Sequence, residues 1–248
     1  MTELTGKHAL VTGGSRGIGR ASALALARAG AQVIVHYGSS MKDAAAVVAE
    51  IRNIGGNAEK VSADLRSADG PHELAKLVRA IIGERLDVLV ANAGISKSAS
   101  IEETTVEDFD NLFAINVRAP FFVIQQLLPL LCTGSSIIFT SSLVARAAAG
   151  NLPAYAATKG AVETLVKHFA SILGPKGIRV NAVAPGVVNT DLSSFTKTEV
   201  GRSAALSMQA LKRIAQPDDI GPVVAFLASD EARWITGDSI RADGGSKL

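Results

Sequence analysis

The sequence has a single cysteine, few aromatic residues and no long uninterrupted apolar run. Cys132 is the only cysteine among 248 residues, so no disulfide can form within the chain, which is typical of a reducing compartment. Charged residues interrupt or bound every apolar segment before it reaches the ~20 residues that a membrane span needs, so we expect no membrane partner. The four histidines show no ligand spacing, and no metal site is expected.

The charge of the chain is nearly balanced. Lys and Arg number 25 and Asp and Glu number 23, which gives a net charge of +2. The basic residues are scattered without aromatic interleaving, so nucleic acid is not an expected partner. A hydrophobic content of 48% argues against disorder, and the length suits one large domain, which we place over residues 1–248.

The two ends of the sequence bear on localisation. Met1-Thr2-Glu3-Leu4 starts acidic and does not resemble a signal peptide, so a cytoplasmic protein is expected. Ser246-Lys247-Leu248 matches a peroxisomal address, which has meaning only where a receptor reads it. Peroxisomal localisation in a eukaryote is therefore the alternative.

Strand-like and helix-like segments alternate along the chain. Buried strands are predicted at residues 8–12, 32–36, 86–90, 136–140 and 178–184, and helices at 17–29, 44–51 and 74–81. Repeated β-α units imply right-handed crossovers and an α/β fold, a doubly wound (Rossmann) parallel sheet with helices on both faces. Residues 187–216 are rich in Ser and Thr with weak periodicity, and we interpret them as a mobile substrate flap.

A glycine-rich turn lies between the first strand and the first helix, with the sequence Thr12-Gly13-Gly14-Ser15-Arg16-Gly17-Ile18-Gly19. A helix N-terminus offers free N–H groups and partial positive charge to a pyrophosphate, and glycines let the backbone approach the ligand. The spacing Gly-x3-Gly-x-Gly differs from the common Gly-x-Gly-x-x-Gly fingerprint, so the prediction depends on the strand–turn–helix context. That context predicts a dinucleotide site.

The second strand ends without the carboxylate that NAD enzymes use to bind the ribose 2′-hydroxyl. The sequence at that place is His36-Tyr37-Gly38-Ser39-Ser40. Arg16 and the hydroxyls of Ser39 and Ser40 could receive a 2′-phosphate, although Arg16 alone could also be a solvated loop charge. The pattern favours NADP(H) over NAD.

Tyr155 and Lys159 are four residues apart on a helix predicted to start near Pro153, so they share one face. The lysine heads an apolar stripe and needs a polar partner, which a cofactor ribose would supply. Its positive charge would lower the tyrosine pKa from ~10 and make the phenol a useful acid or base. On its own such a pair is more often an ordinary surface pair.

Two further polar positions accompany this pair. Ser141-Ser142 ends the strand before the helix, at the edge where open α/β sheets bind ligands. Asn116 lies at the i+7 position from Phe109 on an apolar face. Its amide is either satisfied by a local carbonyl or holds a water in a proton path.

Taken in order, these motifs resemble the short-chain dehydrogenase/reductase family, and the chain is similar to its 3-oxoacyl-acyl-carrier-protein reductases. The resemblance covers essentially the whole sequence. It implies that Ser142 orients the substrate oxygen, Tyr155 passes the proton, Lys159 binds the nicotinamide ribose and Asn116 supports a water relay. It also implies a homotetramer packed through helices near 106–131 and 153–173.

The resemblance and the residue patterns described above together predict a set of cofactor contacts. They comprise the glycine turn, the end of the second strand, an adenine contact, the Asn-Ala-Gly motif, the catalytic pair and the loop at the nicotinamide amide: Gly13, Ser15, Arg16, Gly17, Ile18, Gly19, Tyr37, Ser39, Ser40, Asp64, Leu65, Asn92, Ala93, Gly94, Tyr155, Lys159, Pro185, Gly186, Val188 and Thr190. Ala91 departs from the pattern, because many members carry a second asparagine there.

The substrate stays open on the sequence. Residues 127–133 carry no charge, which disfavours docking of an acidic carrier protein and leaves a 3-oxoacyl thioester, a small ketone or a sugar as alternatives. Arg146 could meet an anionic substrate, although a solvated loop arginine is the simpler interpretation. The main alternative function is a non-catalytic dinucleotide sensor or partner-binding protein on the same fold, and the presence of Tyr155 and Lys159 counts against it.

Overall fold

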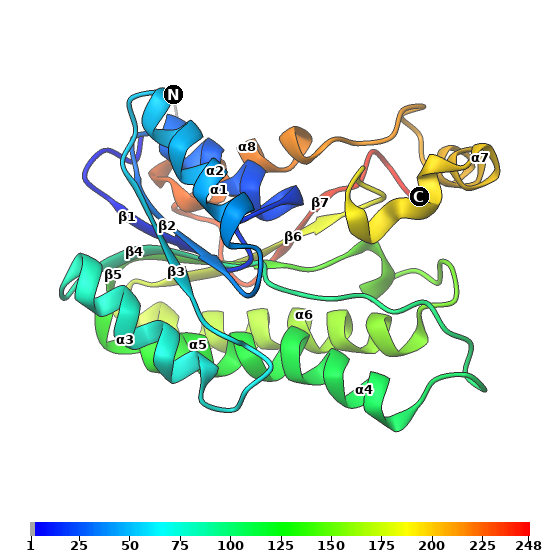
Figure 1. Ribbon diagram of the computed structural model, residues 1–248, viewed down its shortest axis with the longest axis horizontal. Helices are drawn as coiled ribbons and strands as arrows, with labels where there is room; N and C mark the ends of the chain where they lie inside the picture. Colours follow the sequence, from blue (N-terminus) through cyan, green and yellow to red (C-terminus); the bar gives the residue numbers. More distant parts are fainter. Residues whose placement is uncertain (1–2) are drawn as a thin grey trace.

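The computed structural model describes residues 3–248 and places one parallel sheet between two layers of helices (Figure 1). The strand order is β3-β2-β1-β4-β5-β6-β7, and every neighbouring pair is parallel. The strands are β1 (His8–Val11), β2 (Gln32–Tyr37), β3 (Ala58–Ser62), β4 (Leu86–Ala91), β5 (Leu131–Thr140), β6 (Arg179–Pro185) and β7 (Ser239–Ala242). The order reverses between β1 and β4, so the predicted doubly wound fold is confirmed.

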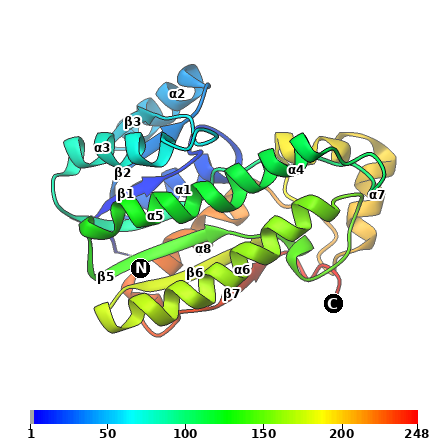
Figure 2. The ribbon, with the colours of Figure 1, turned by 90° about the horizontal axis from the view of Figure 1, so that it is seen from below.

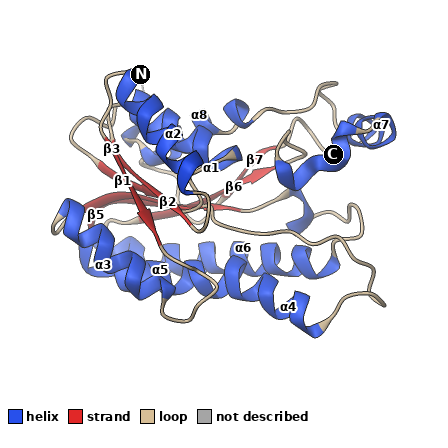
Figure 3. Ribbon diagram, in the orientation of Figure 1, coloured by secondary structure: helices blue, strands red, loops and turns tan. Residues whose placement is uncertain are grey.

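The helices divide between the two faces of the sheet (Figure 3). One layer contains α1 (Gly17–Arg28), α2 (Met41–Asn53) and α8 (Gly221–Ala228). The other contains α3 (Gly70–Ile82), α4 (Val106–Phe113), α5 (Ala119–Leu127) and α6 (Pro153–Leu173). A π-helical turn, η1 (Ala114–Arg118), joins α4 to α5, and this rod lies beside α6 (Figure 2).

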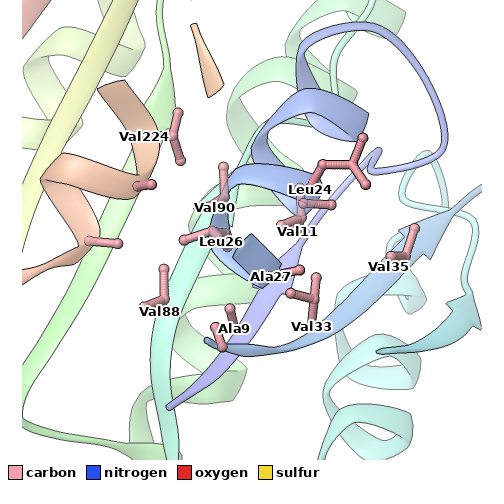
Figure 4. Packing of buried hydrophobic residues seen from close by; sticks show 14 of the residues in the cluster. Ala9, Val11, Leu24, Leu26, Ala27, Val33, Val35, Val88, Val90 and Val224 are labelled. Carbon is pink, nitrogen blue, oxygen red and sulfur yellow. The ribbon is translucent and has the colours of Figure 1, made fainter. Parts of the chain in front are cut away.

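The central strands are apolar on both sides because helices cover both faces of the sheet. In β1, Ala9 and Val11 pack toward α1, whereas Leu10 packs toward the opposite helices, and all three are fully buried. Figure 4 shows the hydrophobic core on the α1 side of the sheet, where Leu24 and Leu26 of α1 lie among the strand side chains. Because side chains alternate between the two faces along each strand, this alternation determines the side of the sheet on which the residues at each strand end lie.

The structure differs from the predicted elements at two places. β5 begins at Leu131, five residues before the predicted start, and residues 187–216 contain a 3₁₀ segment, η5 (Asp191–Lys197), and helix α7 (Glu199–Ser207). Thr198 caps α7 by accepting the Gly201 N–H. The apolar periodicity of α7 is weak because Ala205 is the only buried residue among Glu199–Ser207.

The rod formed by α4, η1 and α5 is apolar along most of its length. Residues 106–130 have a mean hydropathy of 1.3 in their most apolar window, which by length and composition would suffice to cross a membrane. In the molecule 44% of that window is buried. A core helix of a globular protein has the same properties, so the feature does not by itself indicate a membrane.

Candidate active site

The predicted motifs meet at the edge of the sheet where the parallel strands end. The glycine turn follows β1, Asn92-Ala93-Gly94 follows β4, and Ser141-Ser142 follows β5. In parallel strands these ends share one edge, which is also where the strand order reverses. The fold therefore gathers residues that are up to 130 positions apart in the chain.

Backbone crowding explains the glycines of the turn. Gly13 has φ +63°, and a Cβ atom there would lie 2.9 Å from the Ala93 Cα. A Cβ at Gly19 would overlap the Gly13 carbonyl oxygen and lie 2.5 Å from the Asn92 side-chain nitrogen. Any larger side chain at these two positions would push the turn away from β4.

Thr12 and Asn92 tie the turn to the neighbouring strand ends. The Thr12 hydroxyl accepts the N–H groups of Asn92 and Ala93, each at 3.0 Å, and the Asn92 amide donates to the carbonyl oxygens of Thr12 at 3.0 Å and Gly13 at 3.2 Å. The Thr140 hydroxyl, at the end of β5, donates to Asn92 Oδ1 at 3.3 Å. Thr12 and Thr140 are parts of the site that were not predicted, although Thr12 stands at the head of the glycine motif.

The first turn of α1 is suited to an anion. Arg16 precedes the helix with no side-chain cap on the free N–H groups, and the first turn holds no acidic residue. These N–H groups and the dipole of a 12-residue helix favour a negatively charged ligand. The cradle fits the pyrophosphate of a dinucleotide.

The flap begins directly over this cradle. Thr190 Cγ2 would lie 3.3 Å from a Cβ at Gly17, and the Arg16 guanidinium lies 3.3 Å from the Asp191 carboxylate. Both members of this ion pair are well exposed. Arg16, which was predicted to receive a 2′-phosphate, is thus paired with the flap in this structure.

Ile18, Gly94 and Gly186 are half-buried, and the other cofactor positions fall into two groups. Ser39 and Asp64 are exposed, Ser40 is half-buried, and Asp64 forms an ion pair with Arg66. The other group is buried: Tyr37 and Val188 lie in the core on the α1 side, Leu65 lies in the core on the α3 side, and Ser15 and Pro185 are buried as well. The Tyr37 side chain is therefore part of the packing beneath the site, which the sequence prediction did not anticipate.

One face of α6 carries Tyr155 and Lys159 toward the end of β5. The Ser142 hydroxyl is hydrogen-bonded to the Tyr155 phenol, and Lys159 Nζ donates to the Thr140 carbonyl oxygen at 2.8 Å. Lys159 Nζ lies 5.5 Å from the centre of the Tyr155 ring. The structure thus brings Ser142, Tyr155 and Lys159 together at the end of β5.

Burial controls the acidity of this group. It raises the pKa of Tyr155 to about 12, an effect that the Ser142 hydrogen bond partly opposes. It lowers the pKa of Lys159 to about 8, because the ammonium is removed from water. The direction for Tyr155 is opposite to the sequence expectation, because the effect of removing the phenol from water outweighs that of the Ser142 hydrogen bond.

Asn116 lies in the π-helical turn η1 and is buried. Its Oδ1 accepts the Ile95 N–H at 2.9 Å, and its Nδ2 donates to the Ile95 carbonyl oxygen at 2.9 Å and to Thr158 Oγ1 at 3.1 Å. The Thr158 hydroxyl in turn donates to the Tyr155 carbonyl oxygen at 2.7 Å. The Asn116 side chain therefore links the loop after β4 to the helix that carries Tyr155.

Arg146 is neither a solvated arginine nor a free anion site. Its guanidinium pairs with the buried Asp243 at 2.7 Å and donates to the Ser246 carbonyl oxygen at 2.5 Å. The tail held in this way also contacts the far end of the flap, since Lys247 N donates to the Met208 carbonyl oxygen at 2.8 Å. Arg146 stabilises the C-terminal segment beside the site.

Comparison with known proteins gives matches over nearly the whole chain. Residues 13–247 match the sequence family described as Enoyl-(Acyl carrier protein) reductase. An uncharacterized oxidoreductase of Methylorubrum extorquens is 44% identical over 248 residues, covering 99% of both chains. The hydroxynaphthalene reductase of Aspergillus fumigatus is 40% identical over 247 residues, covering 95% of this chain and 90% of that protein.

Solved structures match the fold equally closely. The angucycline C-6 ketoreductase LanV with bound NADP has a TM-score of 0.94 and 41% identity, over 99% of this chain and 97% of that one. A short chain dehydrogenase from Burkholderia cenocepacia in complex with NADP has a TM-score of 0.94 and 37% identity, over 99% of this chain and 100% of that one.

Proposed function

Because the chain belongs to the short-chain dehydrogenase/reductase family, we propose that it is an NADPH-dependent ketoreductase acting on a ketone of a fused-ring aromatic substrate. The observation that carries the proposal is the group formed by Ser142, Tyr155 and Lys159 at the cofactor edge of the sheet. A sensor of dinucleotides would have no use for a buried phenol and ammonium in this arrangement.

Tyr155 is suited to donate a proton rather than to accept one. With a pKa near 12 the phenol is protonated at neutral pH, which is the form that protonates the oxygen of a ketone during reduction. The Ser142 hydroxyl, hydrogen-bonded to the phenol, orients the same oxygen. NADPH, when bound, supplies the hydride. The protonated phenol is therefore the form that ketone reduction uses.

Lys159 and the glycine turn hold the cofactor in this proposal. The Lys159 ammonium, which has one carbonyl partner in the structure, offers its remaining N–H groups to ribose hydroxyls. The turn and the start of α1 would hold the pyrophosphate, and Arg16 with Ser39 and Ser40 would hold the 2′-phosphate. LanV and the Burkholderia cenocepacia dehydrogenase were both crystallised with NADP, which supports this choice.

The flap supports an apolar, flat substrate. Leu192, Phe195 and Val200 are 58%, 47% and 82% exposed, and they follow the contact between Thr190 and the glycine turn. A fused aromatic ring would cover such side chains, whereas a sugar would not. Relatives of this chain named for such ring systems include the hydroxynaphthalene reductase of Aspergillus fumigatus.

The decisive experiment compares wild-type enzyme with Tyr155→Phe. NADPH consumption is followed by absorbance with hydroxynaphthalene-type ketones, 3-oxoacyl thioesters and sugars. We expect turnover of the aromatic ketones and a loss of about 10²–10⁴-fold in kcat for the variant, with NADPH binding retained, because only the proton donor is removed. A variant that keeps most of its rate would overturn the mechanism, and turnover of thioesters alone would overturn the substrate class.

We also propose a cytoplasmic homotetramer with neither membrane nor nucleic-acid partners. The exposed apolar side chains of the α4–α5 rod, Val106, Phe109 and Phe122, would be covered by second copies of the chain. Ser246 of the peroxisome-like tripeptide is 1% exposed and hydrogen-bonded to Asp243, so the first residue of the tripeptide is held against the fold, whereas Leu248 is 94% exposed. This favours cytoplasmic over peroxisomal localisation.

A further inference from the structure

A buried histidine lies directly behind the glycine turn. His36 is the penultimate residue of β2 and is 2% exposed. Its Nδ1 lies 3.1 Å from the Gly13 amide nitrogen, and its Nε2 lies 3.1 Å from the Ala63 carbonyl oxygen. The ring therefore joins the turn before α1 to the segment that leaves β3.

These two contacts determine which nitrogen carries the proton. A backbone N–H can only donate, so Nδ1 must be the unprotonated acceptor for Gly13. A carbonyl oxygen can only accept, so Nε2 must carry the hydrogen for Ala63. Burial lowers the pKa of His36, which favours this neutral form. An imidazolium would turn a second donor toward the Gly13 N–H.

The Gly13 N–H points into the protein rather than toward a ligand. The next amide, Gly14 N–H, donates to the His36 carbonyl oxygen at 2.8 Å, so the turn is fastened to β2 by one side-chain and one main-chain hydrogen bond. Gly13 has φ +63°, and a Cβ atom there would lie 2.9 Å from the Ala93 Cα, so the turn is closely packed against the loop after β4. The shape of the turn thus depends on the unprotonated Nδ1.

We propose that His36 is a positioning residue for the dinucleotide. Its Nδ1 fixes Gly13 so that the free N–H groups of α1 face the pyrophosphate. Protonation of the ring releases the turn and weakens cofactor binding. The inference rests on the cofactor of the proposed function and does not depend on the ketone. It gives a role to a histidine for which neither the motifs nor the catalytic group provides one.

The charged side chains nearest in sequence to the two His36 partners, Gly13 and Ala63, have partners of their own. Arg16, in the turn, pairs with Asp191, and Asp64, which follows Ala63, pairs with Arg66. Arg118, which approaches from η1, donates to the Arg66 carbonyl oxygen. The state of the imidazole is therefore governed by its burial and by Gly13 and Ala63.

Two substitutions separate the roles of the two ring nitrogens. In His36→Asn the side-chain oxygen takes the place of Nδ1 and can still accept the Gly13 N–H. In His36→Gln the amide nitrogen takes the place of Nε2 and keeps only the contact with Ala63. The dissociation constant of NADPH is measured by fluorescence at pH 8, with His8→Asn, a histidine at the opposite end of the sheet, as the control.

We expect His36→Asn and His8→Asn to bind NADPH within about twofold of wild type, and His36→Gln to bind roughly tenfold more weakly, the effect of one lost buried hydrogen bond. Equal binding by the Asn and Gln variants, whether both strong or both weak, would overturn the proposal. Thermal unfolding without cofactor shows whether each variant is folded.

The pH dependence of the NADPH dissociation constant provides a second test, because a purely structural role of His36 would not change it. As the pH falls from 8 to 5, we expect the wild-type dissociation constant to rise relative to that of His36→Asn, mainly at the acid end of the range because burial lowers the pKa of His36. Only the wild type has an imidazole to protonate at this position. The ratio cancels titration of the 2′-phosphate, and NADH, which lacks it, is measured in parallel. A constant ratio overturns the proposal, whereas tight binding of NADH alone would instead revise the proposed cofactor.

Discussion

Lys159 places an ammonium where the fold would prefer an apolar side chain. Its pKa falls from 10.5 to about 8, so between these pH values the unfolded chain binds the proton and the folded protein does not. Stability therefore rises as the pH increases from 8 to 10.5, and below pH 8 the fold bears the full cost, about 3 kcal/mol for such a shift.

Because the buried ammonium destabilises the fold, replacing Lys159 by an apolar residue should raise the free energy of unfolding. We expect Lys159→Met to lose activity and to gain up to about 3 kcal/mol in the free energy of unfolding at pH 7, less the lost hydrogen bond to Thr140. The gain should shrink above pH 8. Urea unfolding at pH 7 and pH 10 measures both, and a variant that is less stable than wild type at pH 7 contradicts the argument.

Arg16 and Asp191 make a second prediction at the scale of residues. If Arg16 binds the 2′-phosphate, it must leave Asp191, which lies 3.3 Å away. We expect Arg16→Ala to raise KM for NADPH about tenfold, the loss of one charge-assisted contact, and to leave KM for NADH unchanged. Asp191→Asn should lower KM for NADPH severalfold, because it removes the competitor. Equal effects on both cofactors would assign the pair to the flap instead.

At the scale of elements, the π-helical turn η1 places Asn116 where a regular helix would not. Both ends of its amide are committed to Ile95 and Thr158. We expect Asn116→Ala to cost about 1–3 kcal/mol, since it leaves buried partners unsatisfied, and to lower kcat, because Thr158 contacts the Tyr155 carbonyl. Asn111→Ala, on the exposed side of α4, is the control for both denaturation and rate. Equal losses in the two variants would contradict this role.

The elements also show what the sequence could predict. β1, β2, β4 and β6 are close to the predicted ranges because their apolar runs are buried on both faces. β3 is an edge strand whose Glu59 and Lys60 are exposed, so it has no continuous apolar run from which its bounds could be predicted. The π-helical turn η1 does not change the spacing of apolar residues in the sequence, so it could not be predicted.

The site was predictable where spacing along one element decides it. Tyr155 and Lys159 follow from helical spacing, whereas the roles of Thr12, His36 and Arg146 depend on partners 23 to 97 residues away. The pKa of Tyr155 could not be foreseen either, because it depends on how completely the surrounding chain removes water.

At the scale of the whole molecule, the α4–α5 rod lies beside α6 on one side (Figure 2), and these helices expose the large apolar side chains of Val106, Phe109, Phe122 and Ile172. We expect the protein to be a tetramer and Phe122→Glu to dissociate it, because a buried charge would lie in the interface. Light scattering after gel filtration measures the mass, and Met41→Glu on α2, at the opposite layer, should leave it unchanged. A wild-type monomer would contradict the assembly.

The position of β1 between β2 and β4 has a consequence for how the chain acquires its shape. The Thr12 hydroxyl donates to the carbonyl of Val90, 78 residues later, so the phosphate cradle closes only after a long loop has been brought together. Such non-local pairing slows folding. In refolding from denaturant, helical structure should therefore recover first and NADPH should bind last, so that the cofactor selects chains that have completed the centre of the sheet.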